Sequence, residues 1–273
     1  MESFHICSGI PVHISDRGKG DKVYLFLHGY LETLYIWDDL MKYLPKNIRA
    51  ISLDTPGHGL SGTNKDVNSM AFCADLLKNL LGKLSIKEKV VIIGHSMGGY
   101  IAIEALKRHP ELFSALVLMH SAPFADSEEK KREREREIEL IRQNKLMQIT
   151  KLAIPKMFAS SNLAKMEDKI IEIEETAQVH DREGIIASIE GMKNREDNSN
   201  VLASSPIPII LFHGKHDNYI PNEKVEMVRE MFPAMQIIWM ENSGHAAFIE
   251  EPELVAERLQ RSLLKDTREE VVE

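Results

Sequence analysis

One serine in the sequence lies in a setting that suits nucleophilic chemistry. The stretch GHSMG, residues 94–98, matches the pattern Gly-x-Ser-x-Gly and follows the apolar run Val90–Ile93. When such a stretch connects a strand to a helix, the turn is strained and raises the serine hydroxyl above the carboxyl ends of the strands. The flanking glycines leave room for a crowded backbone. The pattern therefore predicts that Ser96 is an exposed nucleophile rather than an incidental residue of a tight turn.

A serine hydroxyl needs a base, and the base needs a group that orients it. Two later apolar runs, Ile207–Phe212 and Met235–Met240, are followed by loops that contain Asp217 and His245. The chain order Ser, Asp, His is the order that the Gly-x-Ser-x-Gly turn requires. We therefore predict that His245 is the general base and that Asp217 orients it. The alternatives are a turn or helix cap for Asp217 and a surface loop for His245.

Acyl transfer also needs hydrogen-bond donors for the oxyanion that forms on the substrate. The residue after the nucleophile supplies one donor, the backbone N–H of Met97. The second is expected from the loop after the early apolar run Val23–Leu27, where the backbone N–H of Tyr30 is the candidate. We interpret His28, in the same loop, as structural.

Other polar residues follow predicted strands without completing this arrangement. Asp126 comes shortly after the run Leu116–Met119 and is an alternative to Asp217 as the orienting acid. The stretch DTPGHGLSG, residues 54–62, has the glycines and the proline of a rigid loop. We interpret Asp54 and His58 within it as structural.

Strands that could position these residues alternate with helical patterns, which favours a parallel sheet with helices on both faces. The residues Ser3–Ile14 suit an edge hairpin that turns at Ser8-Gly9. Six predicted strands are Val23–Leu27, Arg49–Leu53, Val90–Ile93, Leu116–Met119, Ile207–Phe212 and Met235–Met240. Predicted helices between or after them are Met70–Leu84, Tyr100–Arg108, Asn222–Met231 and Pro252–Leu264.

The region from Pro123 to Ser204 contains no convincing strand and predicts several inserted helices. It begins with a charge run in which five acids balance five bases over Glu128–Glu137. We interpret this run as the solvated face of a helix rather than as a binding patch. The region continues through Met147, Met157 and Met166, and this Met-rich character suits either loose core packing or a pliable pocket. The residues expected to line such a pocket are Met147, Met157 and Phe158.

Composition narrows the classes of protein that the sequence allows. The 273 residues carry a net charge of −8, which disfavours nucleic acid or an anionic membrane as a partner. No stretch approaches the roughly 20 apolar residues of a membrane span, and the first residues lack the pattern of a signal peptide. The two cysteines, Cys7 and Cys73, are therefore expected as free thiols in the cytoplasm.

The motifs HGY, DTPGHGLS, GHSMGG, HGKHD and SGH, in this order, resemble those of the α/β-hydrolase family. The resemblance spans nearly the whole chain. It implies an α/β-hydrolase fold, with a mostly parallel eight-stranded sheet and an inserted helical cap. The core would comprise residues 1–122 and 205–273, and the cap residues 123–204. The resemblance also implies the roles assigned above to Ser96 and its two partners, with no metal or organic cofactor.

The same comparison narrows the branch of the family. A serine at position 96 argues against haloalkane dehalogenases and epoxide hydrolases, which use an aspartate nucleophile. The segment HGYLET lacks both the HGGG of many lipases and the HGxP of those two groups. The chain looks more like small capped esterases, C–C bond hydrolases and cofactor-free haloperoxidase-like members.

The leading hypothesis is a serine esterase that acts on a small or medium acyl substrate through an acyl-enzyme. The same residues also serve C–C bond cleavage, thioester cleavage and lyase reactions, so these alternatives stay open. A hypothesis of another class is a small-molecule binding protein with little turnover. The sequence leaves the natural substrate and the oligomeric state undetermined.

Overall fold

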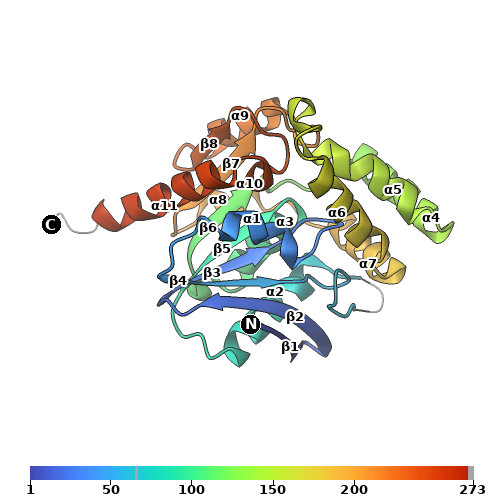
Figure 1. Ribbon diagram of the computed structural model, residues 1–273. Coiled ribbons are helices and arrows are strands. Elements are labelled where there is room, and N and C mark those ends of the chain that lie inside the picture. Colours follow the sequence, from blue (N-terminus) through green and yellow to red (C-terminus); the bar gives the residue numbers. More distant parts are fainter. Residues whose placement is uncertain (65–66, 270–273) are drawn as a thin grey trace.

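Eight strands form a single sheet in the order β1-β2-β4-β3-β5-β6-β7-β8 (Figure 1). The computed structural model describes residues 1–64 and 67–269. Strands β3 to β8 pair in parallel, whereas β1 and β2 pair antiparallel. The predicted mostly parallel eight-stranded sheet is therefore confirmed. The strands are β1 (Glu2–Cys7), β2 (Ile10–Gly18), β3 (Lys22–Leu27), β4 (Ile48–Leu53), β5 (Val90–His95), β6 (Phe113–Met119), β7 (Ile209–Gly214) and β8 (Gln236–Met240).

The first two strands form the predicted hairpin at the edge of the sheet. Ser8 and Gly9 connect them with φ angles of 49° and 87°. Two consecutive positive φ angles match the right-handed twist of the strands that such a turn joins, and glycine adopts them without strain. The central strands β5 and β6 are buried along almost their whole length. Their continuous apolar sequence is typical of parallel strands that are covered on both faces.

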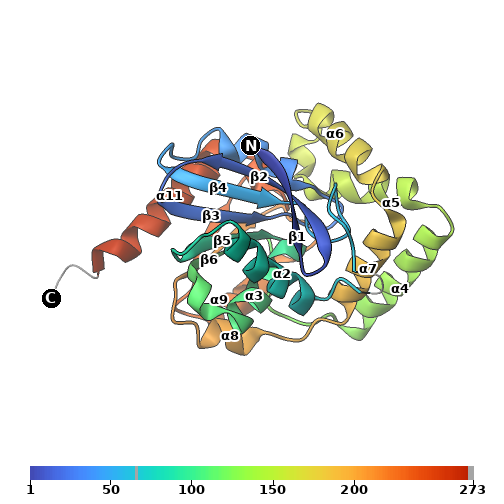
Figure 2. The ribbon, with the colours of Figure 1, turned by 90° about the horizontal axis from the view of Figure 1, so that it is seen from below.

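Helices cover the sheet in two groups. Helices α2, α3 and α8 pack on one another, and α1, α10 and α11 form the second group (Figures 1 and 2). Helix α2 illustrates why these segments are helical, because Ser69 caps its first turn and one leucine stripe is buried. The helices are α1 (Asp38–Met41), α2 (Met70–Lys83), α3 (Met97–Arg108), α4 (Glu128–Arg142), α5 (Leu146–Ala153), α6 (Glu167–Gln178), α7 (Arg182–Lys193), α8 (Ser199–Ala203), α9 (Asn222–Met231), α10 (Ala247–Glu250) and α11 (Pro252–Glu269).

Residues 123–204, here called the helical insertion, separate β6 from β7 and contain helices α4 to α8. Helices α4 to α7 gather at one side of the molecule in both ribbon views (Figures 1 and 2). Helix α8 instead packs on the core helix α3, where the Asn198 amide donates to Glu104. We propose that α4 to α7 form the cap that is expected over residues 123–204.

Candidate active site

The predicted nucleophile occupies a strained turn at the end of β5. Ser96 has φ 47° and ψ −111°, and helix α3 begins at the next residue. A Cβ atom at Gly94 would collide with the backbone of Gly98, and one at Gly98 would collide with the carbonyl oxygen of Leu27. The backbone N–H of Ser96 donates to the carbonyl of Met119 at 3.0 Å, which anchors the turn to β6. The glycines are therefore required because the backbone passes too close for any side chain.

Asp217 and His245 meet at the carboxyl ends of β7 and β8. The Nδ1–H of His245 donates to Asp217 Oδ2 at 2.7 Å, which leaves the other ring nitrogen free to accept a proton. The backbone N–H groups of Tyr219 and Ile220 donate to Asp217 Oδ1 at 2.7 and 3.0 Å. Burial alone would raise the pKa of Asp217, but the neighbouring rings of His245 and His120 hold it well below its usual value. The aspartate is therefore a fixed anion beneath the histidine.

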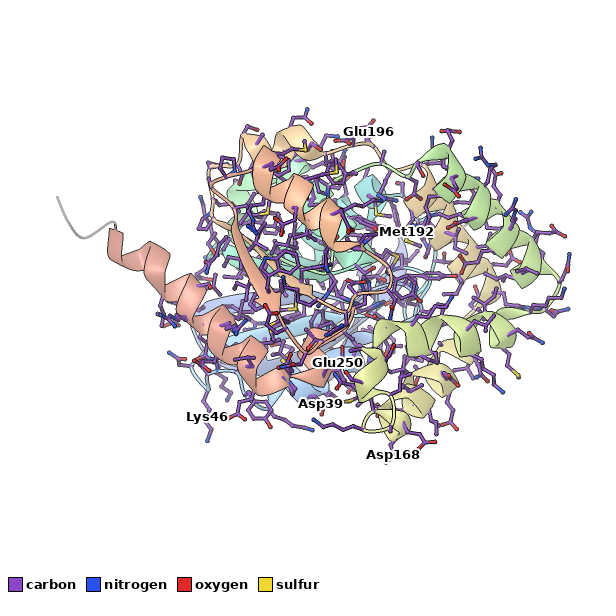
Figure 3. All side chains as sticks on the ribbon, turned by 90° about the horizontal axis from the view of Figure 1, so that it is seen from above. Asp39, Lys46, Asp168, Met192, Glu196 and Glu250 are labelled. Atoms are coloured by element: carbon purple, nitrogen blue, oxygen red, sulfur yellow. The ribbon has the colours of Figure 1, made fainter. Side chains whose placement is uncertain are left out.

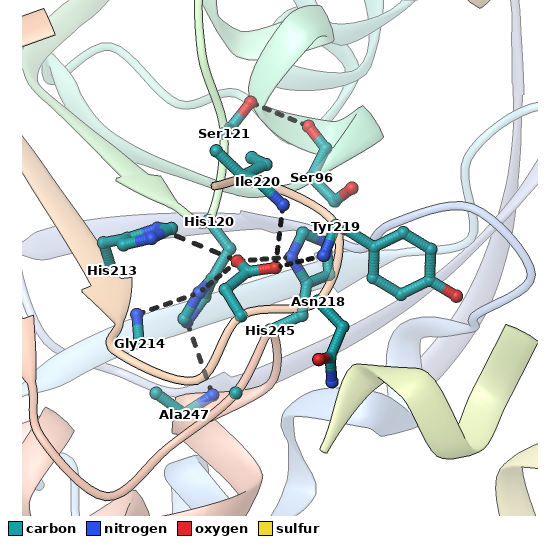
Figure 4. A network of polar contacts seen from close by, with 12 residues as sticks. Ser96, His120, Ser121, His213, Gly214, Asn218, Tyr219, Ile220, His245 and Ala247 are labelled. Carbon is teal, nitrogen blue, oxygen red and sulfur yellow. Dashed lines mark hydrogen bonds and ion pairs between the residues drawn. The ribbon is translucent and has the colours of Figure 1, made fainter. Parts of the chain in front are cut away.

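Two further histidines surround the same carboxylate (Figure 4). His120 Nδ1 lies 3.3 Å and His213 Nδ1 3.7 Å from Asp217 Oδ2. Burial lowers the pKa of His120 to about 3, so its ring is neutral, and its Nε2 accepts from the backbone N–H of Ala247. In the described part of the chain these three residues could hold a metal ion. A metal there would compete with His245 for Asp217, so the observed hydrogen bond is the simpler role for this carboxylate.

Ser96 and His245 line one cavity of about 340 Å³. It lies between the carboxyl ends of the strands and the helical insertion. Its size is at the lower end of small-molecule sites. The ring of Tyr219 packs against His245 with centroids 4.9 Å apart, as Figure 4 shows, and its hydroxyl donates to the carbonyl of Ala153 in the helical insertion. Burial raises the pKa of Tyr219, which keeps this hydroxyl protonated.

Of the two predicted oxyanion donors, Tyr30 lines this cavity. Met97 follows the predicted nucleophile at the first position of α3. Within residues 1–64 and 67–269, neither backbone N–H has a hydrogen-bond acceptor. Leu31, next to Tyr30, has φ 63° and donates its own N–H to His58 at 3.3 Å, which holds the loop in place.

A buried ion pair beneath the site was not foreseen from the sequence. Glu32 accepts from the backbone N–H of Gly29 at 2.6 Å and from His95 Nδ1 at 2.9 Å. The other nitrogen of His95 donates to the carbonyl of His245 at 2.8 Å. Although burial opposes it, His95 holds the pKa of Glu32 below its usual value. The pair thus links the loop that carries Tyr30 to the loop that carries His245. The one available signal was a glutamate four residues after His28.

Glu250 is a second buried carboxylate that sequence reasoning missed (Figure 3). One oxygen accepts from the backbone N–H of Gly244, next to His245, at 2.6 Å. The other accepts from Ala159 and Asn162 of the helical insertion at 2.9 and 2.6 Å. Glu250 therefore ties the histidine loop to the helical insertion.

The interpretation of the Glu128–Glu137 run as a solvated face was wrong in part. Helix α4 does carry solvated ion pairs, such as Lys130 with Glu133 at 2.8 Å. However, Lys130, Arg134 and Glu137 line the cavity. They recur at helical spacing on one side of α4, a pattern that the balanced charges concealed.

The alternative acid and two expected pocket residues are placed elsewhere. Asp126 is bound by Arg134 and Arg195 and does not contact His245. Of the expected pocket residues, Met157 lines the cavity, whereas the Met147 side chain is exposed and Phe158 is buried outside it.

The polar residues interpreted as structural bind the backbone or one another. Asp54 accepts from His13 Nδ1 and from the N–H groups of Leu34 and Leu60 at 2.8 to 2.9 Å. His28 accepts from the N–H of Thr55 at 2.9 Å.

Comparison with known proteins defines the class to which this arrangement belongs. A family model described as the alpha/beta hydrolase fold matches residues 23–252. The chain is therefore a member of the α/β-hydrolase family, as its motifs predicted.

The relatives and solved structures that the chain resembles include esterases and a carboxylate synthase. A putative 2-succinyl-6-hydroxy-2,4-cyclohexadiene-1-carboxylate synthase of Bacillus subtilis is 27% identical, with 91% of this chain and 93% of the relative covered. A pimeloyl-[acyl-carrier protein] methyl ester esterase of Klebsiella pneumoniae is 23% identical, with 89% and 93% covered. The solved structure of a thermophilic esterase from Thermogutta terrifontis superposes with a TM-score of 0.91 at 26% identity, covering 97% and 98% of the two chains.

Two further expectations concern the cysteines and the membrane. Cys7 and Cys73 are both free and buried, as expected. Over the described residues, every helix is too short or too polar to cross a membrane.

Proposed function

We propose that the protein is a serine esterase that hydrolyses small or medium acyl esters through an acyl-enzyme. The observation that carries the proposal is the 2.7 Å hydrogen bond from His245 to a buried Asp217, at a cavity that Ser96 also lines. An oriented histidine with a free ring nitrogen is the base that a serine hydroxyl needs.

The proposed reaction proceeds in two steps. His245 accepts the proton of Ser96 as the hydroxyl oxygen attacks the ester carbonyl carbon. The backbone N–H groups of Tyr30 and Met97 bind the resulting oxyanion. The tetrahedral intermediate collapses, and His245 protonates the leaving alcohol. His245 then deprotonates a water molecule that attacks the acyl-enzyme, which releases the acid and restores Ser96.

The test is hydrolysis of p-nitrophenyl esters of increasing acyl length by wild type and by the Ser96→Ala variant. We expect turnover to fall for long acyl chains because the cavity is small. Ser96→Ala should lower kcat by more than about 10³-fold, because it removes the nucleophile while the oxyanion donors stay. The neighbouring Ser121→Ala is the matched control, since the Ser121 hydroxyl donates to the Ser96 carbonyl and lies outside the proposed chemistry.

Labelling separates the outcomes. A reactive phosphonate should modify Ser96, and peptide mass spectrometry locates the adduct. Labelling without ester turnover would replace the esterase by a thioester or C–C bond hydrolase with the same residues. If Ser96 is not labelled and no ester is turned over, the catalytic role of Ser96 is contradicted. A binding protein is then the favoured alternative.

A further inference from the structure

Helix α4 contributes charged side chains to the lining of the cavity. The proposed esterase reaction does not use these side chains. Lys130, Arg134 and Glu137 lie at positions i, i+4 and i+7, so they share one side of the helix. Lys156 lines the same cavity. Three cationic side chains thus surround the space next to Ser96 in a chain whose net charge is −8.

Arg134 is buried yet retains unused hydrogen-bond donors. Its side chain is only 9% exposed, and its Nε–H donates to Asp126. Across the residues that the structure describes, the four N–H groups on its two terminal nitrogens have no acceptor. A buried guanidinium satisfies these donors when it can, because leaving them unpaired costs free energy.

Arg195 binds the same aspartate and provides a comparison, because its contacts are structural. It donates to Asp126, to the carbonyl of Phe124 and to the carbonyl of Met192, at 2.7 to 3.0 Å. Its guanidinium also lies 4.0 Å from the centre of the Tyr100 ring. Arg195 does not line the cavity. Arg134 therefore differs from Arg195 in lining the cavity and in donating through Nε alone.

Arg134 and Arg195 share a single aspartate. Asp126 is one carboxylate shared by two guanidinium groups, which hold its pKa below the usual value although burial opposes them. Glu137 is the nearby acid on α4, but it makes no ion pair with Arg134 within 4.0 Å and instead accepts from the Tyr30 hydroxyl at 2.8 Å. Burial raises the pKa of Glu137 above its usual value.

We propose that this cavity selects short esters that carry one carboxylate, which the terminal N–H groups of Arg134 bind while the ester carbonyl lies at Ser96. The planar guanidinium matches a carboxylate with two parallel hydrogen bonds. A single negative charge fits better than a phosphate dianion, because Glu137 lies beside the arginine. The proposal rests on the proposed function and names its substrate class.

The experiment compares two esters of equal length, mono-p-nitrophenyl glutarate and p-nitrophenyl pentanoate. They differ in whether the acyl chain ends in a carboxylate or a methyl group. Wild type should have the higher kcat/KM for the glutarate ester. Arg134→Gln should lower the glutarate-to-pentanoate ratio of kcat/KM by about 10- to 100-fold, because charge-assisted hydrogen bonds are lost. Glu137→Gln should raise this ratio, since it removes the competing charge.

Arg195→Gln is the matched control, because it also removes an ion pair from Asp126 but no donor from the cavity. Its ratio should stay within about twofold of wild type. Arg134→Lys keeps the positive charge but loses the planar guanidinium with its parallel N–H groups. Its glutarate-to-pentanoate ratio of kcat/KM should lie between those of wild type and Arg134→Gln. Urea unfolding of each variant shows whether it is folded.

A binding measurement separates this proposal from the proposed function. Isothermal titration of glutarate into the Ser96→Ala variant should show binding that is lost when Arg134→Gln is added. Ser96-dependent turnover with an unchanged ratio in Arg134→Gln would overturn the carboxylate proposal and leave the esterase standing. Preference for an ester with a terminal ammonium group, lost in Glu137→Gln, would also overturn it. Glutarate binding without turnover of either ester would support the carboxylate site and contradict the esterase.

Discussion

The carboxyl ends of the strands and helix α4 line the same cavity, but they hold their polar groups in different ways. At the carboxyl ends of the strands, Asp217 accepts from two backbone N–H groups of its own loop and from His245, and these bonds fix its position. On α4, the terminal nitrogens of Arg134 have no acceptor among the described residues, and Lys130 pairs only with exposed Glu133. The strand ends thus hold polar groups in fixed positions, as the proposed reaction requires. Helix α4 keeps donors without an acceptor, so the proposed chemistry and the proposed selectivity would reside on different parts of the fold.

The largest difference between the two regions is expected when Asp217 is substituted. The Asp217→Asn variant should lower kcat for p-nitrophenyl pentanoate by about 10⁴-fold, because a neutral amide neither stabilises the imidazolium nor selects the correct tautomer of His245. Steady-state kinetics measure this loss. The matched control is Asp126→Asn, which removes the other acid that follows a strand and should reduce kcat far less. Equal losses in the two variants would contradict the assignment of Asp217.

The buried pair of Glu32 and His95 tests whether the edge is rigid because of contacts beneath it. Glu32→Gln should lower the free energy of unfolding by about 3–5 kcal/mol, since it removes a buried carboxylate that accepts from the backbone N–H of Gly29 and from His95 Nδ1. Urea unfolding measures the loss.

The exposed pair of Lys107 and Glu196 is the control for Glu32→Gln (Figure 3 labels Glu196). Glu196→Gln should leave the unfolding free energy nearly unchanged, because solvent screens this pair. If Glu32→Gln were as mild, the link between the two active-site loops would carry little of the site's stability.

A smaller effect is expected where the helical insertion contacts the core. His180 Nδ1 accepts from the backbone N–H of Gly59 at 3.1 Å, which requires a neutral ring, and burial lowers the pKa of His180 to about 4. The unfolded chain binds this proton more readily, so the stabilisation is present above the ordinary pKa of 6.5 and is lost as pH falls from 6.5 toward 4. Between pH 7 and pH 5 this histidine alone should lower the unfolding free energy by about 2 kcal/mol.

The His180→Gln variant sharpens this prediction. Glutamine can still accept from Gly59 but does not titrate, so its loss of stability between pH 7 and pH 5 should be about 2 kcal/mol smaller than that of wild type. Urea unfolding at the two pH values makes the comparison. Parallel pH profiles for the two proteins would show that His180 does not contribute. His120, with a pKa lowered to about 3, adds the same tendency in both.

Local sequence accounts for the sheet and for the position of the proposed catalytic residues. The runs Val90–Ile93 and Ile207–Phe212 are continuous and apolar because both faces of their strands are buried. Since parallel strands place their carboxyl ends at one edge, the residues that follow them come together without further information. Ser96, Asp217 and His245 could be named for this reason. The hairpin at Ser8-Gly9 was equally local, because a two-residue turn depends on backbone angles alone.

Contacts between distant segments decided the rest. Glu32 and His95 are 63 residues apart and met only when β3 and β5 paired. The sequence by itself determined the strained turn at Ser96, because crowding at that turn is a property of adjacent residues. It did not determine the role of Arg134, since the balanced charges of α4 are compatible with solvent on every side. Only the tertiary placement of α4 brought that arginine to the cavity that Ser96 also lines, because the side of a helix that is covered depends on what the tertiary structure places against it.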